Sequence, residues 1–98
     1  MFKIIKIDLE FLETQKVDLP PKAEILSVKL QGGCICLFVT GDVEARTNEK
    51  TILMYPTDAE ITIGYDADYH SIKYIDTVIF KDRSEYHLFL AKNFGVGG

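Results

Sequence analysis

The sequence predicts an all-β, mainly antiparallel domain, folded as a small β-sandwich or partly closed barrel of six to seven strands with at most one short helix. Its apolar residues fall in short runs that alternate with period two or are apolar on both faces. Turn-forming Gly, Pro and Asp residues separate these runs. No segment keeps a 3.6-residue apolar period, so the only helical turn we allow is at Pro56–Glu60. The 98 residues fit a single domain, predicted over residues 1–92 with a flexible glycine-rich tail at 93–98.

The first strand is predicted at Phe2–Phe11, where apolar and polar residues alternate. Two adjacent apolar residues at Ile4-Ile5 break the phase, and we expect a β-bulge there that lets both halves of the strand face inward. Val17–Leu19 is a short second segment. The Pro20-Pro21 pair ends it, because proline has no N–H to donate to a strand ladder.

Residues 23–40 predict the clearest hairpin. Its first strand, Ala23–Leu30, carries three apolar residues on one face, namely Leu26, Val28 and Leu30. The turn is Gln31-Gly32-Gly33. The returning strand, Cys34–Thr40, is apolar on both faces, which favours a central strand that is covered on both sides.

The second half of the chain predicts a further strand, a long loop and a second hairpin. A polar loop spans 41–50, and Thr51–Tyr55 is a strand that a turn at 56–58 closes. A short strand at Ala59–Gly64 is a further candidate, followed by a polar and aromatic loop at 65–70. The second hairpin pairs two strands around a turn at 81–84, namely Ile72–Phe80 and Glu85–Lys92.

The net charge of −4 is concentrated in the middle of the chain. Residues 41–70 carry 7 acidic and 2 basic residues, whereas the remainder is close to neutral. Such a surface does not favour nucleic acid, which is bound by clustered Lys and Arg. It is suited to a basic protein partner or a cation, or it serves only to keep a β-rich chain in solution.

The acidic region also holds the candidate binding residues. Asp66 and Asp68 alternate as the ligands of a hard cation do, but two carboxylates are too few, so we expect neither a metal nor a cofactor. Tyr65 and Tyr69 are better understood as aromatic anchors of an interface. The predicted partner-binding residues are Asp58, Glu60, Tyr65, Asp66, Asp68, Tyr69 and His70.

The two cysteines, Cys34 and Cys36, predict no disulfide. Alternate residues of a strand have Cα atoms ~6.5–7 Å apart, at the upper limit for a disulfide. We expect two small buried side chains in a reducing cytoplasm. A tetrahedral metal site would need His70 and His87 to converge on both thiols, and nothing in the sequence supports that.

Catalysis and export are not expected. His87 would need a nucleophile and an orienting carboxylate to act as a base, and its neighbours Ser84 and Glu85 diverge along a strand. Residues 1–12 mix charged and apolar side chains, which is unlike a secretory signal, and no run reaches the ~20 apolar residues of a membrane span. We therefore expect no enzyme, no membrane association and a cytoplasmic location.

Four segments resemble a small, uncharacterised, phage-associated protein family. The most specific is Leu19–Val28, which reads Leu-Pro-x-x-Ala-x-Ile-Leu-Ser-Val. Three shorter segments follow in the same order, namely Cys36–Phe38, Tyr74–Val78 and His87–Phe89. The resemblance implies a short β-rich protein, often phage-encoded, with no assigned activity and no catalytic residues. Where that family often has Gly-Thr-Gly-His, this chain has Tyr55–Asp58.

Three functions remain open from the sequence. The first is a non-enzymatic protein–protein interaction module, which the resemblance extends to a phage-encoded inhibitor of a host defence enzyme, acting in the host cytoplasm. The second is a protein that sequesters a small ligand such as a nucleotide. Only the Gln31–Gly33 turn and the basic residues Lys81 and Arg83 offer phosphate donors for it. The third is a virion accessory protein that assembles as a homo-oligomer.

Overall fold

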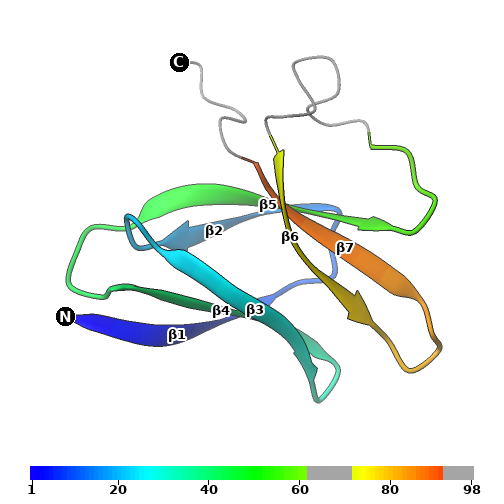
Figure 1. The fold of residues 1–98 in the computed structure, drawn as a ribbon, viewed down its shortest axis with the longest axis horizontal. Helices are drawn as coiled ribbons and strands as arrows, with labels where there is room; N and C mark the ends of the chain where they lie inside the picture. Colours follow the sequence, from blue (N-terminus) through cyan, green and yellow to red (C-terminus); the bar gives the residue numbers. More distant parts are fainter. Residues whose placement is uncertain (62–71, 92–98) are drawn as a thin grey trace.

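The computed structural model describes residues 1–61 and 72–91, which form two antiparallel sheets (Figure 1). One sheet has the strand order β1-β4-β3 and the other the order β2-β5-β7-β6. The strands are β1 Phe2–Leu9, β2 Thr14–Leu19, β3 Glu24–Gln31, β4 Cys34–Asp42, β5 Asn48–Pro56, β6 Ile72–Ile79 and β7 Glu85–Ala91. The described residues contain no helix, so the predicted small all-β sandwich is confirmed. It follows that none of them forms a helix long enough to cross a bilayer.

The core lies between the two sheets and is built from alternate strand residues. Leu37 of β4, Ile52 of β5 and Leu88 of β7 are all completely buried. Each such side chain contributes roughly 1.5–3 kcal/mol through removal of apolar surface from water. A second, smaller cluster lies on the other face of the four-stranded sheet, where Leu53, Tyr55, Ile72 and Ala91 are buried.

Both predicted hairpins are present. In β3–β4 the register closes at Gln31↔Cys34. Gly32 and Gly33 have φ values of 59° and 84°, as a two-residue type I′ turn requires. In β6–β7 the register closes at Ile79↔Glu85, and Arg83 carries the left-handed φ of 71°. The glycine pair was therefore a reliable turn signal.

The predicted bulge at Ile4-Ile5 is wrong. The β1–β4 register runs without a shift from Phe2↔Asp42 to Leu9↔Ile35, and β1 ends at Leu9 instead of Phe11. Ile5, Ile7 and Leu9 pack inward. Ile4 instead points to the solvent side of the sheet and is 68% exposed. The apolar residues at the start of β1 therefore lie on both faces, and one of those faces is not covered by the fold.

The bulges occur on β3 and β6. On β3 the register shifts between Ile25 and Ser27, so Leu26 does not share the face of Val28 as predicted. Leu26 is 50% exposed, whereas Val28 is 4% exposed. On β6 the register shifts between Tyr74 and Asp76. The extra residue in each strand turns one side chain away from the face that the alternation predicts.

Several segments between and at the ends of the strands also differ from the sequence prediction; β2, for example, begins at Thr14 instead of Val17. The predicted loop at 41–50 is shorter, because β4 continues to Asp42 and β5 begins at Asn48, where β2 provides pairing partners. Residues 59–61 are not in a strand, and the rest of the candidate strand 59–64 lies outside the described residues. At 56–60 the chain forms a β-turn with a hydrogen bond from Ala59 N to Pro56 O, not a helix. The predicted tail at 93–98 also lies outside the described residues.

One side of the sandwich is joined between the sheets by a side chain. The carboxylate of Asp76 on β6 accepts a hydrogen bond from the backbone N–H of Val28 on β3, at 3.1 Å. β3 and β6 consequently lie side by side (Figure 1). On the other side, β1 and β2 are the edge strands of their sheets. The sandwich is therefore closed along β3 and β6 and carries two sheet edges along β1 and β2.

Candidate functional site

The outer face of the three-stranded sheet carries the most exposed group of large apolar side chains on strands. We call this group, Phe2, Ile4, Leu26 and Phe38, the outer apolar face. Phe2 is 69% exposed, Ile4 is 68% and Leu26 is 50%, and Phe38 is half-buried. Alternation along β1 and β4 places three of them on the solvent side, and the β3 bulge adds Leu26. Large apolar side chains grouped on an exposed face commonly mark a site of interaction.

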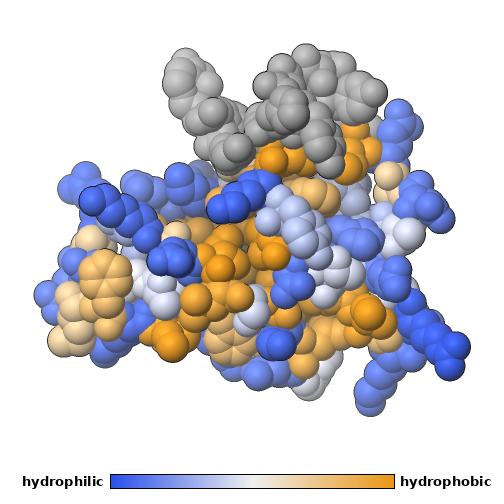
Figure 2. Space-filling view, in the orientation of Figure 1, coloured by the Kyte–Doolittle hydropathy of each residue, from blue (hydrophilic) through white to orange (hydrophobic). Residues whose placement is uncertain are grey.

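This face is slightly hollowed and is bordered by polar side chains. Ile4, Leu26 and Phe38 line a shallow depression of about 500 Å³, together with Lys29 and Gln31. Figure 2 shows hydrophobic surface along the lower rim of the molecule, over β1, β4 and β3. An apolar centre with a polar rim is the usual anatomy of a protein interface.

Cys36 lies among the side chains of this same outer side and is 1% exposed. Its Sγ lies 3.5 Å from Oδ1 of Asp8, its register partner on β1. Burial, followed by the hydrogen bond to the Asp8 carboxylate, raises the pKa of the Cys36 thiol. Cys36 is thus a protonated, packed thiol. The prediction of two buried cysteines is wrong for Cys34, which is exposed because it directly follows the Gly33 turn.

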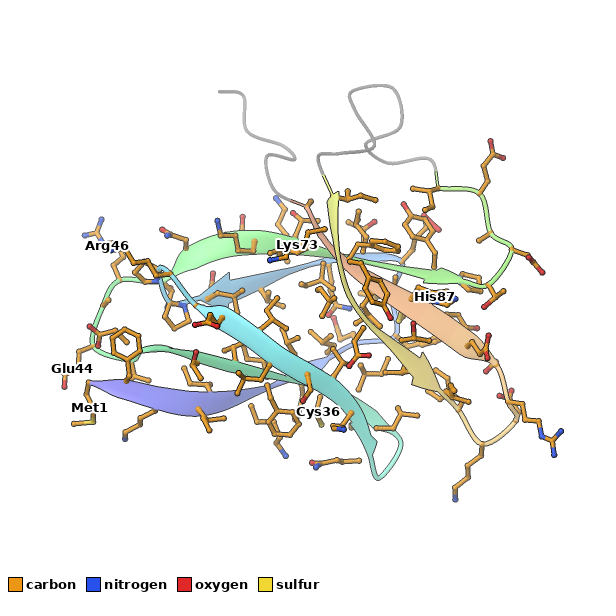
Figure 3. The ribbon with its side chains drawn as sticks, viewed as in Figure 1. Met1, Cys36, Glu44, Arg46, Lys73 and His87 are labelled. Atoms are coloured by element: carbon orange, nitrogen blue, oxygen red, sulfur yellow. The ribbon has the colours of Figure 1, made fainter. Side chains whose placement is uncertain are left out.

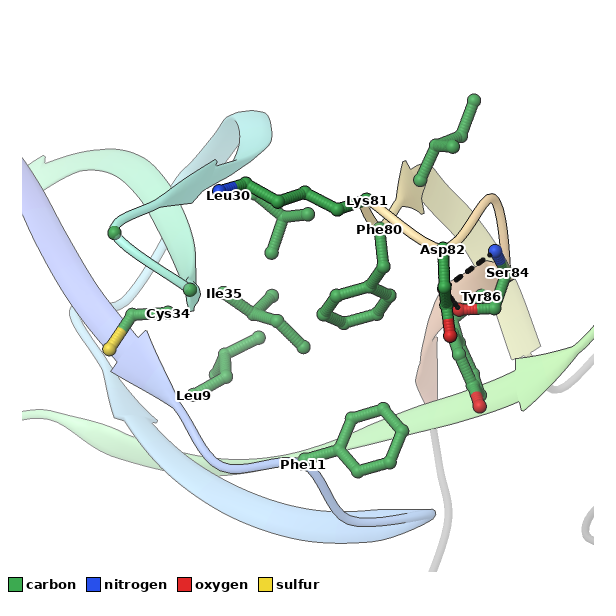
Figure 4. Close-up of a pocket in the computed structure, with 13 residues that line it drawn as sticks. Leu9, Phe11, Leu30, Cys34, Ile35, Phe80, Lys81, Asp82, Ser84 and Tyr86 are labelled. Atoms are coloured by element: carbon green, nitrogen blue, oxygen red, sulfur yellow. Dashed lines mark hydrogen bonds between the residues drawn. The ribbon is translucent and has the colours of Figure 1, made fainter.

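A second candidate site is a cleft at the end of the sandwich, between the β3–β4 and β6–β7 turns (Figure 4). We call it the end cleft. Its volume is about 1160 Å³, and its apolar floor includes Leu9, Leu30 and Ile35. The rim contains the Gly32-Gly33 turn on one side and Lys81 on the other. The structure therefore brings together two of the three predicted phosphate-donor elements. Arg83 is not among the lining residues.

Three aromatic rings form one wall of the end cleft. Phe11 packs edge-to-face on Tyr86 with ring centroids 4.9 Å apart, and on Phe80 at 5.7 Å. Phe80 and Tyr86 are 5.5 Å apart. Offset or edge-to-face pairs of this kind contribute about 0.5–1.5 kcal/mol each beyond their burial. Phe11 is nevertheless 60% exposed, so one side of this ring cluster is open to a ligand.

Two charged side chains line the end cleft, Lys81 and Asp82, and the carboxylate of Asp82 is hydrogen-bonded to Ser84. Asp82 Oδ1 accepts hydrogen bonds from Ser84 Oγ at 2.6 Å and from Ser84 N at 3.0 Å. These bonds, the hydroxyl's first, lower the pKa of Asp82. Asp82 therefore serves the local turn, which leaves Lys81 as the cation of the lining.

His87 lies in a chain of hydrogen bonds on the outer side of the four-stranded sheet; Figure 3 shows its position on β7. Thr57 Oγ1 donates to Glu85 Oε1 at 3.0 Å, so it can only accept from His87 Nε2, 2.8 Å away. His87 Nδ1 lies 2.9 Å from Thr77 Oγ1, which lies 2.7 Å from the Tyr74 hydroxyl. A neutral His87 is therefore protonated on Nε2. Both ring nitrogens are occupied by threonine hydroxyls, which agrees with a structural role.

The predicted partner-binding residues are only partly described. Asp58 lies in the turn after β5 with a left-handed φ of 72°, and both Asp58 and Glu60 are exposed. The other five lie outside the described residues, namely Tyr65, Asp66, Asp68, Tyr69 and His70. Within residues 1–61 and 72–91, no three His, Cys, Asp or Glu side chains gather as metal ligands would.

Sequence reasoning missed the outer apolar face because it assigned both halves of β1 to the core. A signal was present in the sequence. Alternation places Phe2 and Ile4 on one face of the strand, and Ile5, Ile7 and Leu9 on the other. Apolar residues on both faces of an edge strand indicate a second apolar surface outside the core, which another protein surface can bury. Leu26 had no such signal, because its exposure depends on the bulge in β3.

The fold and these surfaces define a small, all-β sandwich domain with an apolar face outside its core. Comparison with known proteins assigns a family: the chain belongs to the family described as "Domain of unknown function (DUF7352)", which it matches over residues 1–96. No curated protein and no solved structure matches the chain.

Proposed function

We propose that this protein is a non-enzymatic protein–protein interaction module, and that its partner docks on the outer apolar face. The observation that carries the proposal is the exposure of Ile4 and Leu26 around a shallow hollow, with Phe2 exposed on the same face of β1. Aromatic and aliphatic anchors of this kind supply most of the binding energy of protein interfaces. The phage-like resemblance of residues 19–28 supports a host enzyme as the partner and inhibition as the effect.

The test uses two leucines of similar exposure. Leu26 is 50% exposed on the outer apolar face, and Leu12, 46% exposed, lies in the connection between β1 and β2. Aspartate at Leu26 places an unpaired charge in the middle of the proposed interface, whereas aspartate at Leu12 does not. Protein captured from a host lysate by the wild type and by Leu12→Asp, but not by Leu26→Asp, would support the proposal.

The same experiment has clear contrary outcomes. Equal capture by the wild type and by Leu26→Asp would show that the outer apolar face is not the docking surface. Recovery of no partner at micromolar concentration would count against an interaction module altogether. Capture of a particle protein in place of an enzyme would favour the virion accessory role.

The end cleft favours a second candidate function, the binding of a small ligand with an apolar body and an anionic group. The observation that favours it is that Lys81 and the Gly32-Gly33 turn both line this cleft, around an apolar floor. Ligand pockets of proteins are typically ~300–1,000 Å³ and mainly apolar, with a few polar groups that fix orientation. A nucleotide panel is the first choice of probe.

Thermal denaturation tests the ligand function. A ligand at 100 times its dissociation constant stabilises the folded chain by ~2.7 kcal/mol, which is measured as a rise in melting temperature. We expect Lys81→Gln to reduce that rise, and the control Lys29→Gln, on the outer side of β3, to leave it unchanged. An unchanged melting temperature with every nucleotide would remove this candidate.

A further inference from the structure

The edge of β1 offers unpaired backbone groups in a defined pattern. Among the described residues β1 pairs with β4 alone, and Figure 1 shows no strand beyond it on that side. The backbone N–H of Val43 donates to the C=O of Met1, so Met1 and Val43 are a hydrogen-bonded pair of the β1–β4 ladder. In an antiparallel ladder such pairs alternate, so Lys3, Ile5 and Ile7 also bond to β4. The N–H and C=O groups of the even-numbered residues point away from β4, at Phe2, Ile4, Lys6 and Asp8.

Glu10 confirms this alternation. Its N–H donates to Oε1 of Gln15 at 3.0 Å, and its C=O accepts from Nε2 of Gln15 at 2.7 Å. The side-chain amide of Gln15 thus makes the two bonds that a residue of a further strand would make. The stretch open to strand pairing is therefore limited to Phe2–Asp8.

The other edge of the same sheet is blocked. The carboxylate of Asp76 takes the outward N–H of Val28 on β3, and β6 packs beside it. An additional strand can join the three-stranded sheet only along β1. Such strand addition is a common mode of protein recognition, in which the backbone supplies hydrogen bonds and alternate side chains supply specificity.

From this geometry we propose that β1 pairs antiparallel with β1 of a second copy, with Ile4 opposite Ile4 on the two-fold axis. This register also places Phe2 opposite Lys6 of the second copy. The apolar Ile4 side chains then meet at the centre, and the Lys6 stem covers the Phe2 ring. The edge is self-complementary in this register, as a two-fold interface requires.

Neighbouring registers that keep the same backbone bonds are less favourable. If the two-fold axis moves from Ile4 to Lys6, Lys6 lies opposite Lys6, which sets like charges opposite each other. The register between these two, with the axis at Ile5, pairs Ile4 with Lys6 and Phe2 with Asp8, so that each of these apolar side chains faces a charge. A shift of the axis in the other direction, to Lys3, pairs Phe2 with Ile4, but it sets Lys3 opposite Lys3, again like charges, and it shortens the paired stretch. Side-chain chemistry therefore selects the register centred on Ile4. The dimer is one six-stranded sheet in which the two outer apolar faces are continuous.

Proline substitution can test pairing at this edge without disturbing the fold. The N–H of Ile4 points away from β4, so Ile4→Pro removes a donor from the outer edge and none from the β1–β4 ladder. The matched control is Lys16→Pro on β2. The bond from Met54 N to Glu13 O sets the same alternation there, so the N–H of Lys16 also points outward. Circular dichroism and hydrogen exchange of the β4 amides check that both variants fold.

Native mass and sedimentation decide the proposal. We expect the wild type and Lys16→Pro to have twice the 11.1 kDa mass of one chain at micromolar concentration. We expect Ile4→Pro to raise the dimer dissociation constant about tenfold or more. A monomeric wild type, or a dimer that survives Ile4→Pro and dissociates in Lys16→Pro, would overturn the proposal.

Cross-linking decides the register. In a Cys34→Ser background, Ile4→Cys places two thiols across a hydrogen-bonded pair with Cα atoms ~5.5 Å apart, within disulfide range. We expect oxidised dimers from Ile4→Cys and none from Lys6→Cys, and the reverse result would overturn the register. Leu26 is on β3, away from this edge. Leu26→Asp therefore tests partner docking without touching the dimer, and the two proposals can fail independently.

Discussion

Asp76 and Val28, 48 positions apart in the chain, are joined by a hydrogen bond of 3.1 Å from the backbone N–H of Val28 to the Asp76 carboxylate. Each lies beside a bulge: the β3 register shifts between Ile25 and Ser27, and the β6 register shifts between Tyr74 and Asp76. The two irregularities therefore face each other and close one side of the sandwich. This bond leaves β1 as the edge at which the three-stranded sheet can accept another strand.

Removal of that carboxylate should loosen the closed side. Asp76→Ala leaves the partly buried N–H of Val28 without its acceptor, and it also removes the bond from Thr77 N to Oδ1. We expect a loss of about 1–3 kcal/mol in the free energy of unfolding, measured by urea denaturation, and faster exchange of the Val28 amide. Asp18→Ala, at an exposed position of β2, is the control. Unchanged exchange at Val28 would contradict the role given to Asp76.

Gly41 should not tolerate a side chain. A Cβ atom at this position of β4 would lie 2.6 Å from Cβ and 2.7 Å from Cγ of Pro20. The proline ring cannot rotate away, so the strand or the 20–23 turn must shift. We expect Gly41→Ala to cost about 1–3 kcal/mol, measured by denaturation. Gly41→Ala combined with Pro20→Ala should recover part of the loss, and an unaffected single variant would contradict the contact.

Asp82 should give the fold a small dependence on acid. The hydrogen bonds from Ser84 Oγ and N lower its pKa from the ordinary value of 3.8. A carboxyl group whose pKa is lower in the folded state stabilises the fold above its unfolded pKa. That stabilisation is lost as the pH falls through the folded value. We therefore expect Asp82→Asn to be less stable than the wild type at neutral pH.

This difference should shrink as the pH falls below about 4, where the carboxyl group is protonated in the unfolded chain. Melting curves of both proteins between neutral pH and acid measure it. Ser84→Ala should show the same trend at a smaller size, because it removes the hydroxyl bond to Asp82 and keeps the backbone one. A difference in stability that stays constant with pH would contradict the assignment.

The imidazole of His87 should carry its proton on Nε2 when it is neutral. This follows because Thr57 donates its only hydroxyl proton to Glu85 and must accept from the ring. Nitrogen chemical shifts of labelled protein distinguish the two tautomers directly. Thr57→Val should weaken the preference, because it removes the acceptor. A neutral ring protonated on Nδ1 in the wild type would contradict the chain of bonds.

The sequence by itself determined the fold class and the two hairpins. Those features depend on interactions local in sequence: the left-handed backbone that Gly32-Gly33 adopts easily, and the alternation of apolar residues in each strand. Leu37 and Val39 are buried on the inner face of β4, but the cover predicted for its other face is incomplete, because Cys34 is exposed and Phe38 is only half-buried. The function was not determined in this way, because no local motif in the described strands requires a particular chemistry.

The tertiary structure alone decided which face of β1 is covered. Apolar residues of both parities, Ile4 and Ile5, are equally suited to a core, and only the pairing with β4 assigns Ile5 inward and Ile4 outward. The exposure of Leu26 likewise depends on the β3 bulge, which lies next to Val28, whose N–H bonds to Asp76 of the other sheet. Which face is buried depends on contacts between residues distant in sequence. The alternation within a strand shows that side chains point to two faces, but it does not show which face is buried when both carry apolar residues.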